Sequence, residues 1–153
     1  MNIFYIDTCP VKAAQMQCDK HVVKMILESA QMLCAAHHIE GDGNVPYKLA
    51  HKNHPSTVWV RSNRKHYDWL YRHFKGLSEE YTDRYGKVHL SWEKCHTPLL
   101  FAPSSILDTE WVDPPQCMPD ECKRETSLEG YTEYYFNYKP QVIDMRFRGV
   151  KYE

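Results

Sequence analysis

Apolar and small residues recur at helical spacing in three stretches of the chain. The first stretch runs from Val11 to about His38, and Pro10 suits the first turn of a helix. Its polar residues fall within an arc of about 100° on a helical wheel. They are Gln17, Lys20, His21, Lys24, Glu28, Gln31 and His38. The pattern predicts a central helix over 11–38 with one polar stripe that faces a cleft or solvent.

A second helix is predicted over about 56–85. Ser56 or Thr57 can cap its start, directly after a proline. Gly86 marks its C-terminal end, and Gly76 is a point at which it can bend or split.

A last helix is predicted over 127–138, where four tyrosines follow helical spacing before Pro140. Residues 87–126 contain five prolines and are expected to form a long ordered loop with short helical turns. A strand is expected only over Asn2–Ile6. The sequence therefore predicts an all-α fold: a compact bundle of about three main helices with a long irregular Pro-rich segment, in one domain over 1–153.

Length and composition indicate an ordinary folded protein. The chain has 153 residues, of which 25% are charged and 42% hydrophobic, and its net charge is −1. This balance excludes a strongly basic DNA coat protein but not a local nucleic-acid site. The chain has no run of about 18 apolar residues and no signal-like start. We therefore expect a cytoplasmic protein without a membrane partner, with its six cysteines reduced.

The charge is unevenly distributed along the chain. Residues 48–75 hold seven Lys or Arg residues and one acid, whereas residues 76–125 hold five basic and ten acidic residues. The basic stretch also contains aromatic residues between its cations, which suits phosphate binding beside base stacking. Arg61, Arg64, Lys65, Trp59 and Trp69 are the candidates. The alternative is a solvated helix face with ordinary core aromatics.

Several His and Cys pairs invite a metal interpretation. Cys18 and Cys34 each precede a histidine by three residues, but they lie about 24 Å apart along one predicted helix and cannot share an ion. His21 can still meet His51 and His54 if the loop folds back. A second possible cluster consists of Cys95, His96, Cys117 and Cys122. Neither spacing is a standard zinc signature, so we expect no metal and no cofactor.

The polar stripe of the first predicted helix offers a better candidate site. Lys24 and Glu28 are i, i+4 neighbours, and His21 lies one turn earlier on the same side. An amine beside a carboxylate can attack a sugar carbon to form a Schiff base while the carboxylate moves protons. The alternative is a solvent-exposed ion pair of a few tenths of a kcal/mol.

Three further stretches of the sequence are distinctive: the start of the chain (Met1-Asn2-Ile3, then Ala13-Ala14-Gln15), the His51-Lys52-Asn53-His54-Pro55 element, and the helix end from Glu79 to Gly86. In these stretches the chain resembles the phage pyrimidine-dimer DNA glycosylases of the endonuclease V type and their bacterial relatives. The Tyr134-Tyr135…Lys139 region is similar to the aromatic-rich C-terminal tail of that family. The stretch from Cys18 to Met25 is also similar to small phage proteins of unassigned role, whose location would be the host cytoplasm.

The resemblance implies a compact helical fold and a DNA duplex with damaged or modified pyrimidines as substrate. It further implies base flipping, together with glycosylase and abasic-lyase chemistry through an imine. We expect the protein to be a monomer. In the family the nucleophile is an N-terminal α-amine and a glutamate of the first helix is the acid and base. These roles would fall here on Met1 and Glu28.

Three hypotheses follow. In the first, the protein is a DNA base-excision enzyme, with Glu28 as acid and base and with the Met1 amine or Lys24 as nucleophile. In the second, another nucleotide- or modified-base-directed enzyme uses His21 and a substrate-binding group formed by His51, Asn53 and His54, with or without a metal. In the third, a non-enzymatic phage protein binds a host partner through its acidic 87–126 segment.

Overall fold

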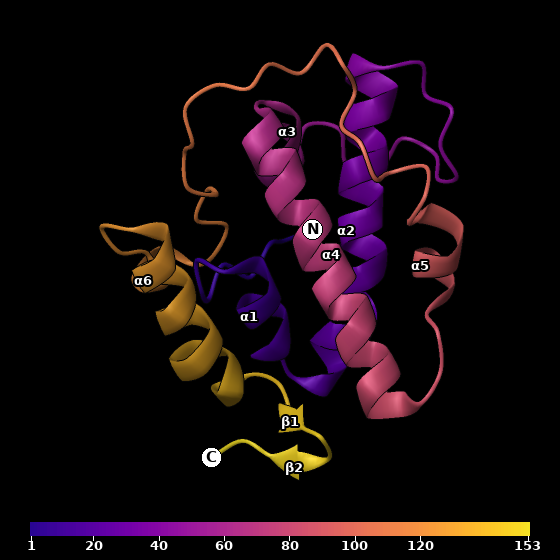
Figure 1. Cartoon of the computed structure of the whole chain (residues 1–153). Coiled ribbons are helices and arrows are strands. Elements are labelled where there is room, and N and C mark those ends of the chain that lie inside the picture. Colours follow the sequence, from indigo (N-terminus) through magenta and orange to yellow (C-terminus); the bar gives the residue numbers. More distant parts are fainter.

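Two long helices form the centre of the molecule. In this computed structural model, which describes residues 1–153, α2 (Asp19–Glu40) packs along α4 (Arg64–Tyr85) (Figure 1). The short α1 (Pro10–Gln15) lies against α4, and α3 (Pro55–Arg61) lies against α2. On the other side of the molecule, α5 (Leu90–Cys95) contacts α2 and α4. The predicted all-α fold is confirmed.

The prediction of one helix over 11–38 is wrong, because the chain leaves the helical path between α1 and α2. Cys18 is extended, with φ −70° and ψ 163°, and it precedes the first residue of α2. Its backbone N–H donates to the Tyr135 hydroxyl at 2.8 Å. The Arg84 guanidinium donates to the carbonyls of Gln17 at 2.8 Å and Gln15 at 3.1 Å. These distant partners satisfy the backbone groups that the break leaves free.

The predicted helix over 56–85 is also two helices. The break lies at Ser62 and Asn63, and the Asn63 side chain caps α4 by accepting from the N–H of Lys65. Gly76 does not bend the helix. A Cβ there would lie 3.1 Å from the Cβ of Ala14, so this glycine allows α1 to approach α4 closely.

Helical structure covers the predicted last helix, although its geometry changes along the way. The segment consists of α6 (Ser127–Glu133), a π-helical turn (Tyr134–Tyr138) and a 3₁₀ turn (Lys139–Gln141). The strand predicted over Asn2–Ile6 is wrong, because that segment has no sheet partner. Instead β1 (Arg146–Phe147) and β2 (Val150–Lys151) form a small antiparallel hairpin with Arg146 opposite Lys151.

Residues 87–126 contain α5 and a 3₁₀ turn (Asp120–Cys122), and the remainder is irregular. This segment arches from α5 over the end of α3 to α6 (Figure 1). Several of its carbonyls accept hydrogen bonds from residues 59–65, among them Leu107 from the Arg64 N–H, Glu110 from Asn63 Nδ2, and Val112 from Trp59 Nε1. The segment is therefore fastened to the basic stretch of the same chain.

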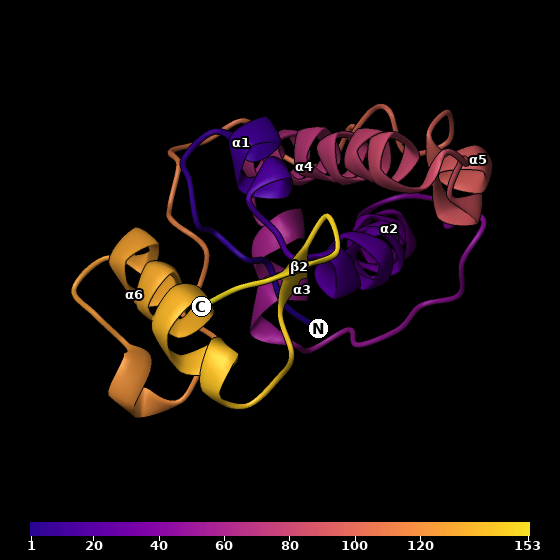
Figure 2. The same ribbon diagram turned by 90° about the horizontal axis from the view of Figure 1, so that it is seen from below.

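The chain start is buried in the core. Ile3, Phe4, Tyr5 and Ile6 are each at most 4% exposed. Figure 2 shows the N-terminus on the side of α2 and α3 that lies away from α4. No helix is both long and apolar enough to cross a membrane.

Candidate active site

The α-amine of the chain lies beside a carboxylate of α2. The nitrogen of Met1 is 3.2 Å from Oε1 of Glu28. The Glu28 side chain is only 14% exposed, so water weakens this ion pair less than it would on the surface. The sequence suggested that Glu28 pairs with Lys24, whereas the structure pairs it with Met1.

A cavity of about 210 Å³ opens at this ion pair. His21, Lys24 and Glu28 face it from α2, so the polar stripe predicted from the sequence lines a cavity. The complete lining consists of Met1, Asn2, Phe4, His21, Met25, Lys24, Glu28, Tyr134 and Lys139. The structure thus brings together all four residues predicted to be catalytic and adds groups from the two ends of the chain.

His21 is a neutral imidazole. Burial, followed by the charges of Lys139, Lys24 and Lys20, lowers the pKa of His21 to about 4. Its Nδ1 lies 2.8 Å from the Tyr135 hydroxyl, which already accepts the N–H of Cys18. We assign the Tyr135 proton to the contact with Nδ1, so that this buried hydroxyl both accepts and donates, and the ring proton of His21 is then on Nε2 as a donor.

Lys139 is a site residue that sequence reasoning missed. Its Nζ lies 4.9 Å from the ring centre of Tyr134 and 5.4 Å from that of Phe4, which are cation–π distances. Burial and the charge of Lys24 lower the pKa of Lys139, although the charges of Cys18 and Glu28 act the other way. The one signal in the sequence was the likeness of the Tyr134-Tyr135…Lys139 region to an aromatic-rich tail.

Asn2 anchors the chain start. Its Nδ2 donates to the carbonyl of Cys117 at 2.9 Å, and its Oδ1 accepts from the Tyr131 hydroxyl at 2.7 Å and from the N–H of Ile3 at 2.8 Å. Tyr131 is fully buried. These contacts hold the residue next to Met1 and thereby set the position of the α-amine relative to Glu28.

The loop before α3 also approaches the amine. His54 caps α3, because its Nδ1 accepts the N–H of Ser56 at 3.1 Å. Burial, followed by the charges of the N-terminal amine and His51, lowers the pKa of His54, whereas Glu28 raises it. His54 is therefore near the Met1–Glu28 pair, while His51 and Asn53 are exposed beside it.

The other predicted substrate-binding residues lie elsewhere. Trp59 and Trp69 are 6% and 8% exposed, and both indole nitrogens donate to backbone carbonyls, so neither ring is displayed for base stacking. Arg61 donates to the carbonyl of Lys52, Arg64 donates to that of Ile106, and Lys65 forms an ion pair with Asp108. Because α4 lies away from the N-terminus (Figure 2), Arg64 and Lys65 do not join the cavity.

The His and Cys pairs do not form a metal cluster. No group of three or more His, Cys, Asp or Glu side chains is arranged to hold an ion. Cys95 lies on α5, whereas Cys122 lies in the 3₁₀ turn that contacts α6, at the opposite edge of the molecule (Figure 1). Nδ1 of His21 instead contacts the Tyr135 hydroxyl and the Cys18 Sγ atom.

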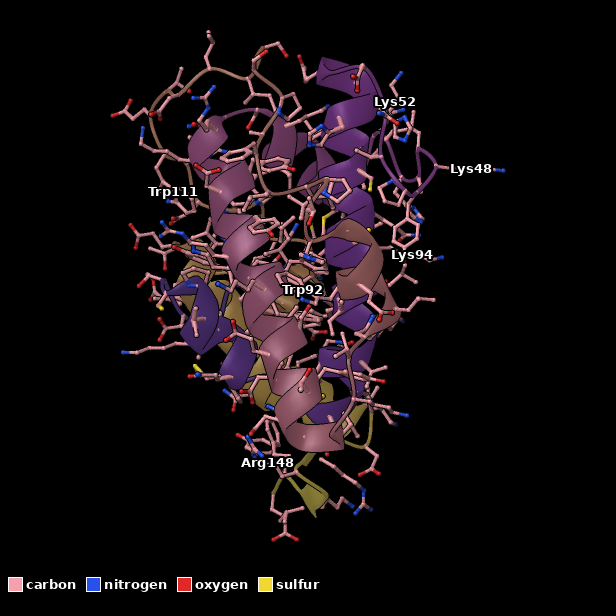
Figure 3. All side chains as sticks on the ribbon, turned by 45° about the vertical axis from the view of Figure 1, so that its right-hand side comes forward. Lys48, Lys52, Trp92, Lys94, Trp111 and Arg148 are labelled. Carbon is pink, nitrogen blue, oxygen red and sulfur yellow. The ribbon has the colours of Figure 1, made fainter.

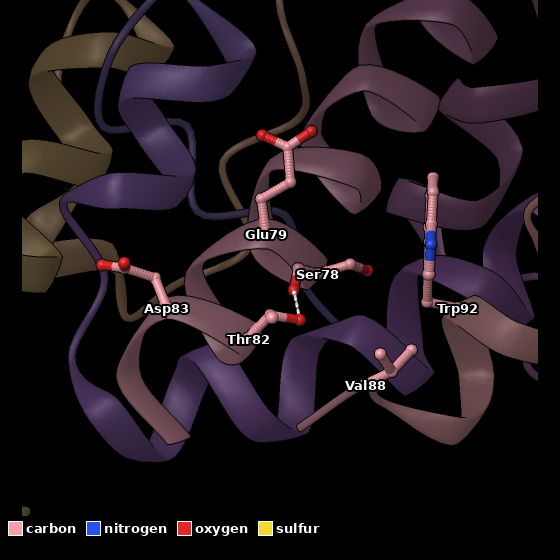
Figure 4. Close-up of a pocket in the computed structure, with 6 residues that line it drawn as sticks. All are labelled: Ser78, Glu79, Thr82, Asp83, Val88 and Trp92. Carbon is pink, nitrogen blue, oxygen red and sulfur yellow. Dashed lines mark hydrogen bonds between the residues drawn. The ribbon is translucent and has the colours of Figure 1, made fainter. Parts of the chain in front are cut away.

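A larger hollow of about 450 Å³ lies between α4 and α5 (Figure 4). Glu79 and Asp83 rise from α4, and Trp92 and Val88 stand across from them. Asp83 also forms an ion pair with Arg148, which belongs to the turn between β1 and β2 and lies near the C-terminal end of α4 (Figure 3). Glu79 has no ion pair in the protein, and its negative charge disfavours a phosphodiester in this hollow.

Comparison with known proteins finds one matching family. A family model described as pyrimidine dimer DNA glycosylase matches residues 1–94. The matched residues include Met1, His21, Lys24 and Glu28 but neither Tyr134 nor Lys139. No curated protein and no solved structure matches the chain.

Proposed function

The chain belongs to the pyrimidine dimer DNA glycosylase family, whose model matches residues 1–94 of its 153, and on this premise we propose that it excises damaged or modified pyrimidines from DNA through an imine. The substrate is a DNA duplex, and the target nucleotide turns out of the stack so that its sugar reaches the cavity. Family membership supports the DNA glycosylase activity, and the site geometry is our reason for the imine.

One observation carries the mechanism: the 3.2 Å contact between the Met1 amine and Glu28. A nucleophilic amine must be neutral, and a neighbouring carboxylate can take its proton. α-Amino groups are in general weaker bases than lysine side chains, with ordinary pKa values of about 8 and about 10.4. We therefore assign the nucleophile to Met1 rather than to Lys24, which lies in the same cavity without an ion pair to Glu28.

The first half of the reaction replaces the base with the enzyme. The neutral Met1 amine attacks C1′ of the sugar, and the bond from C1′ to the base nitrogen breaks. The base leaves with the bonding electrons and takes the proton that Glu28 had removed from the Met1 ammonium, so that Glu28 is again a carboxylate. Glu28 removes a proton from the attached nitrogen and returns it to O4′ as the C1′–O4′ bond breaks. The product is a protonated imine between C1′ and the Met1 nitrogen.

The second half cuts the strand. Glu28, again a carboxylate, removes a proton from C2′, and the C3′–O3′ bond breaks so that the 3′ phosphate leaves with the bonding electrons. Water then hydrolyses the imine and frees the amine. The neutral His21 ring donates a hydrogen bond from its Nε2–H to a substrate oxygen, without transfer of the proton. His51, Asn53 and His54, in the loop before α3, contact the flanking DNA.

Borohydride trapping tests this proposal directly, because borohydride reduces an imine to a stable covalent link. The protein is treated with borohydride on irradiated, abasic and undamaged duplexes. We expect adducts on irradiated and abasic DNA only, and peptide mapping should place the link at Met1. Glu28→Gln should lower the trapping rate by roughly a hundredfold or more. Glu93→Gln, an exposed change on α5, is the matched control and should trap normally.

An extra alanine ahead of Met1 converts the amine to an amide and should abolish the adduct. Adducts that map to Lys24 would preserve the imine but move the nucleophile. No adduct on any duplex would refute the imine mechanism. In that case loss of base release in His51→Ala or His54→Ala would favour a different base-directed reaction.

A further inference from the structure

The cavity carries more positive charge than its one carboxylate can balance. Three amines line it, those of Met1, Lys24 and Lys139, together with Glu28. Glu28 is paired with Met1. Neither Lys24 nor Lys139 forms an ion pair with any carboxylate of the protein. Two cations are therefore left without counter-charges at the mouth of one small cavity.

Lys139 is held where it is by its surroundings. The rings of Tyr134 and Phe4 lie beneath its ammonium at 4.9 Å and 5.4 Å. Lys139 is half-buried, and the nearby charge of Lys24 opposes its own. Since a partly desolvated cation beside a like charge is costly, this arrangement suits an anion that arrives with the ligand.

We propose that Lys24 and Lys139 together bind a DNA phosphate adjacent to the nucleotide whose sugar enters the cavity. This inference rests on the proposed function and extends it to a residue that lies outside the matched 1–94 region. Every sugar in a DNA strand lies between two phosphodiesters, so a nucleotide that reaches the Met1 amine necessarily brings a phosphate close to it. Two ammonium groups from different elements, α2 and the turn after α6, clamp that phosphate and orient C1′ toward the amine.

A duplex with a tetrahydrofuran abasic analogue provides the test, because this analogue has no C1′ leaving group and cannot form an imine. Binding is followed by fluorescence anisotropy over a range of salt concentrations. Lys24→Gln and Lys139→Gln should each weaken binding about tenfold or more. The double variant should also lower the slope of log affinity against log salt by about 1. Lys94→Gln is the matched control, because Lys94 projects from α5 into solvent (Figure 3).

Neutral methylphosphonate links placed on either side of the analogue identify the phosphate. Wild-type protein should lose affinity for one of the two modified duplexes, whereas the double variant should bind that duplex and the unmodified one equally. Competition by inorganic phosphate shows whether a free anion occupies the same site. We expect phosphate to displace the duplex only at phosphate concentrations far above the Kd of the duplex.

Unchanged affinity and salt dependence in both lysine variants would overturn the proposal, as would a wild-type protein that does not bind the duplex. Circular dichroism melts confirm that each variant is folded. The result is independent of the imine chemistry, because a protein that traps no adduct can still show the phosphate contact. Conversely, if the protein is trapped through Met1 but the lysine variants bind the duplex as the wild type does, the proposed function stands and the phosphate contact is refuted.

Discussion

Tyr135→Phe removes one oxygen from the fully buried network behind the cavity. The hydroxyl accepts the N–H of Cys18 at 2.8 Å and lies 2.8 Å from Nδ1 of His21. Both Tyr135 and Cys18 are 0% exposed, so water cannot replace the lost partner. An unpaired buried N–H costs about 1–3 kcal/mol, and loss of the bond to His21 adds to this. We expect Tyr135→Phe to lower the free energy of unfolding by about 2–3 kcal/mol.

For a chain of this length that change corresponds to a fall in Tm of about 4–12 °C. The assay is thermal and urea unfolding followed by circular dichroism at pH 7, with Tyr138→Phe as the control, because Tyr138 lies in the same π-helical turn but is only half-buried. Nitrogen NMR shifts of the His21 ring report the tautomer. The wild-type ring should carry its proton on Nε2, and the variant should show a mixture of tautomers.

A Tyr135→Phe variant as stable as Tyr138→Phe would refute the reasoning, because it would show that the break before α2 does not need this partner. A wild-type His21 protonated on Nδ1 would refute the assigned direction of the hydrogen bond and, with it, the Nε2 donor in the cavity.

Three further predictions follow from other contacts. Tyr131→Phe should slow borohydride trapping on abasic DNA about tenfold with little change in duplex affinity, because Asn2 loses a hydrogen-bond donor that positions the Met1 amine. Equal trapping rates for Tyr131→Phe and wild type would count against this role. Acid should destabilise the protein between pH 6.5 and about 4, because burial lowers the pKa of His21 and of His73 to about 4 and only the unfolded chain binds those protons in this range. The free energy of unfolding should fall by about 3 kcal/mol for each histidine. Urea unfolding of His21→Gln should show a shallower pH dependence than that of the wild type. Arg84→Met should lower the free energy of unfolding in urea by about 3–5 kcal/mol, because Asp19 and Glu80 lose the guanidinium that is buried between them. Arg146→Met, at an exposed ion pair, should lower it by under about 1 kcal/mol.

The periodicity of apolar residues is a local property, and it determined much of the fold. It predicted the all-α class, the last helix and the polar stripe that lines the cavity through His21, Lys24 and Glu28. Both long predicted helices are nevertheless broken. Neither break carries a glycine or proline, and their backbone groups are satisfied by Arg84, Tyr135 and Asn63, of which only Asn63 is nearby in the sequence.

The site shows the same division between local pattern and tertiary packing. The types and spacing of residues on one helix, together with family resemblance, indicated Glu28 and Met1 as candidates. Basic and aromatic character alone could not show that the rings of Trp59 and Trp69 are buried, or that the exposed Lys65 is paired with Asp108 of the same chain.

Only the tertiary structure showed that Glu28 is the carboxylate paired with the Met1 amine and that Lys139 lines the cavity beside them. The buried start of the chain brings the Met1 amine to 3.2 Å from Glu28 of α2, and the Lys139 ammonium lies 5.4 Å from the ring centre of Phe4 in the same segment. The first of these contacts joins residues 27 positions apart and the second joins residues 135 positions apart. They depend on how helices pack rather than on any short-range pattern, and the sequence alone therefore could not reveal them.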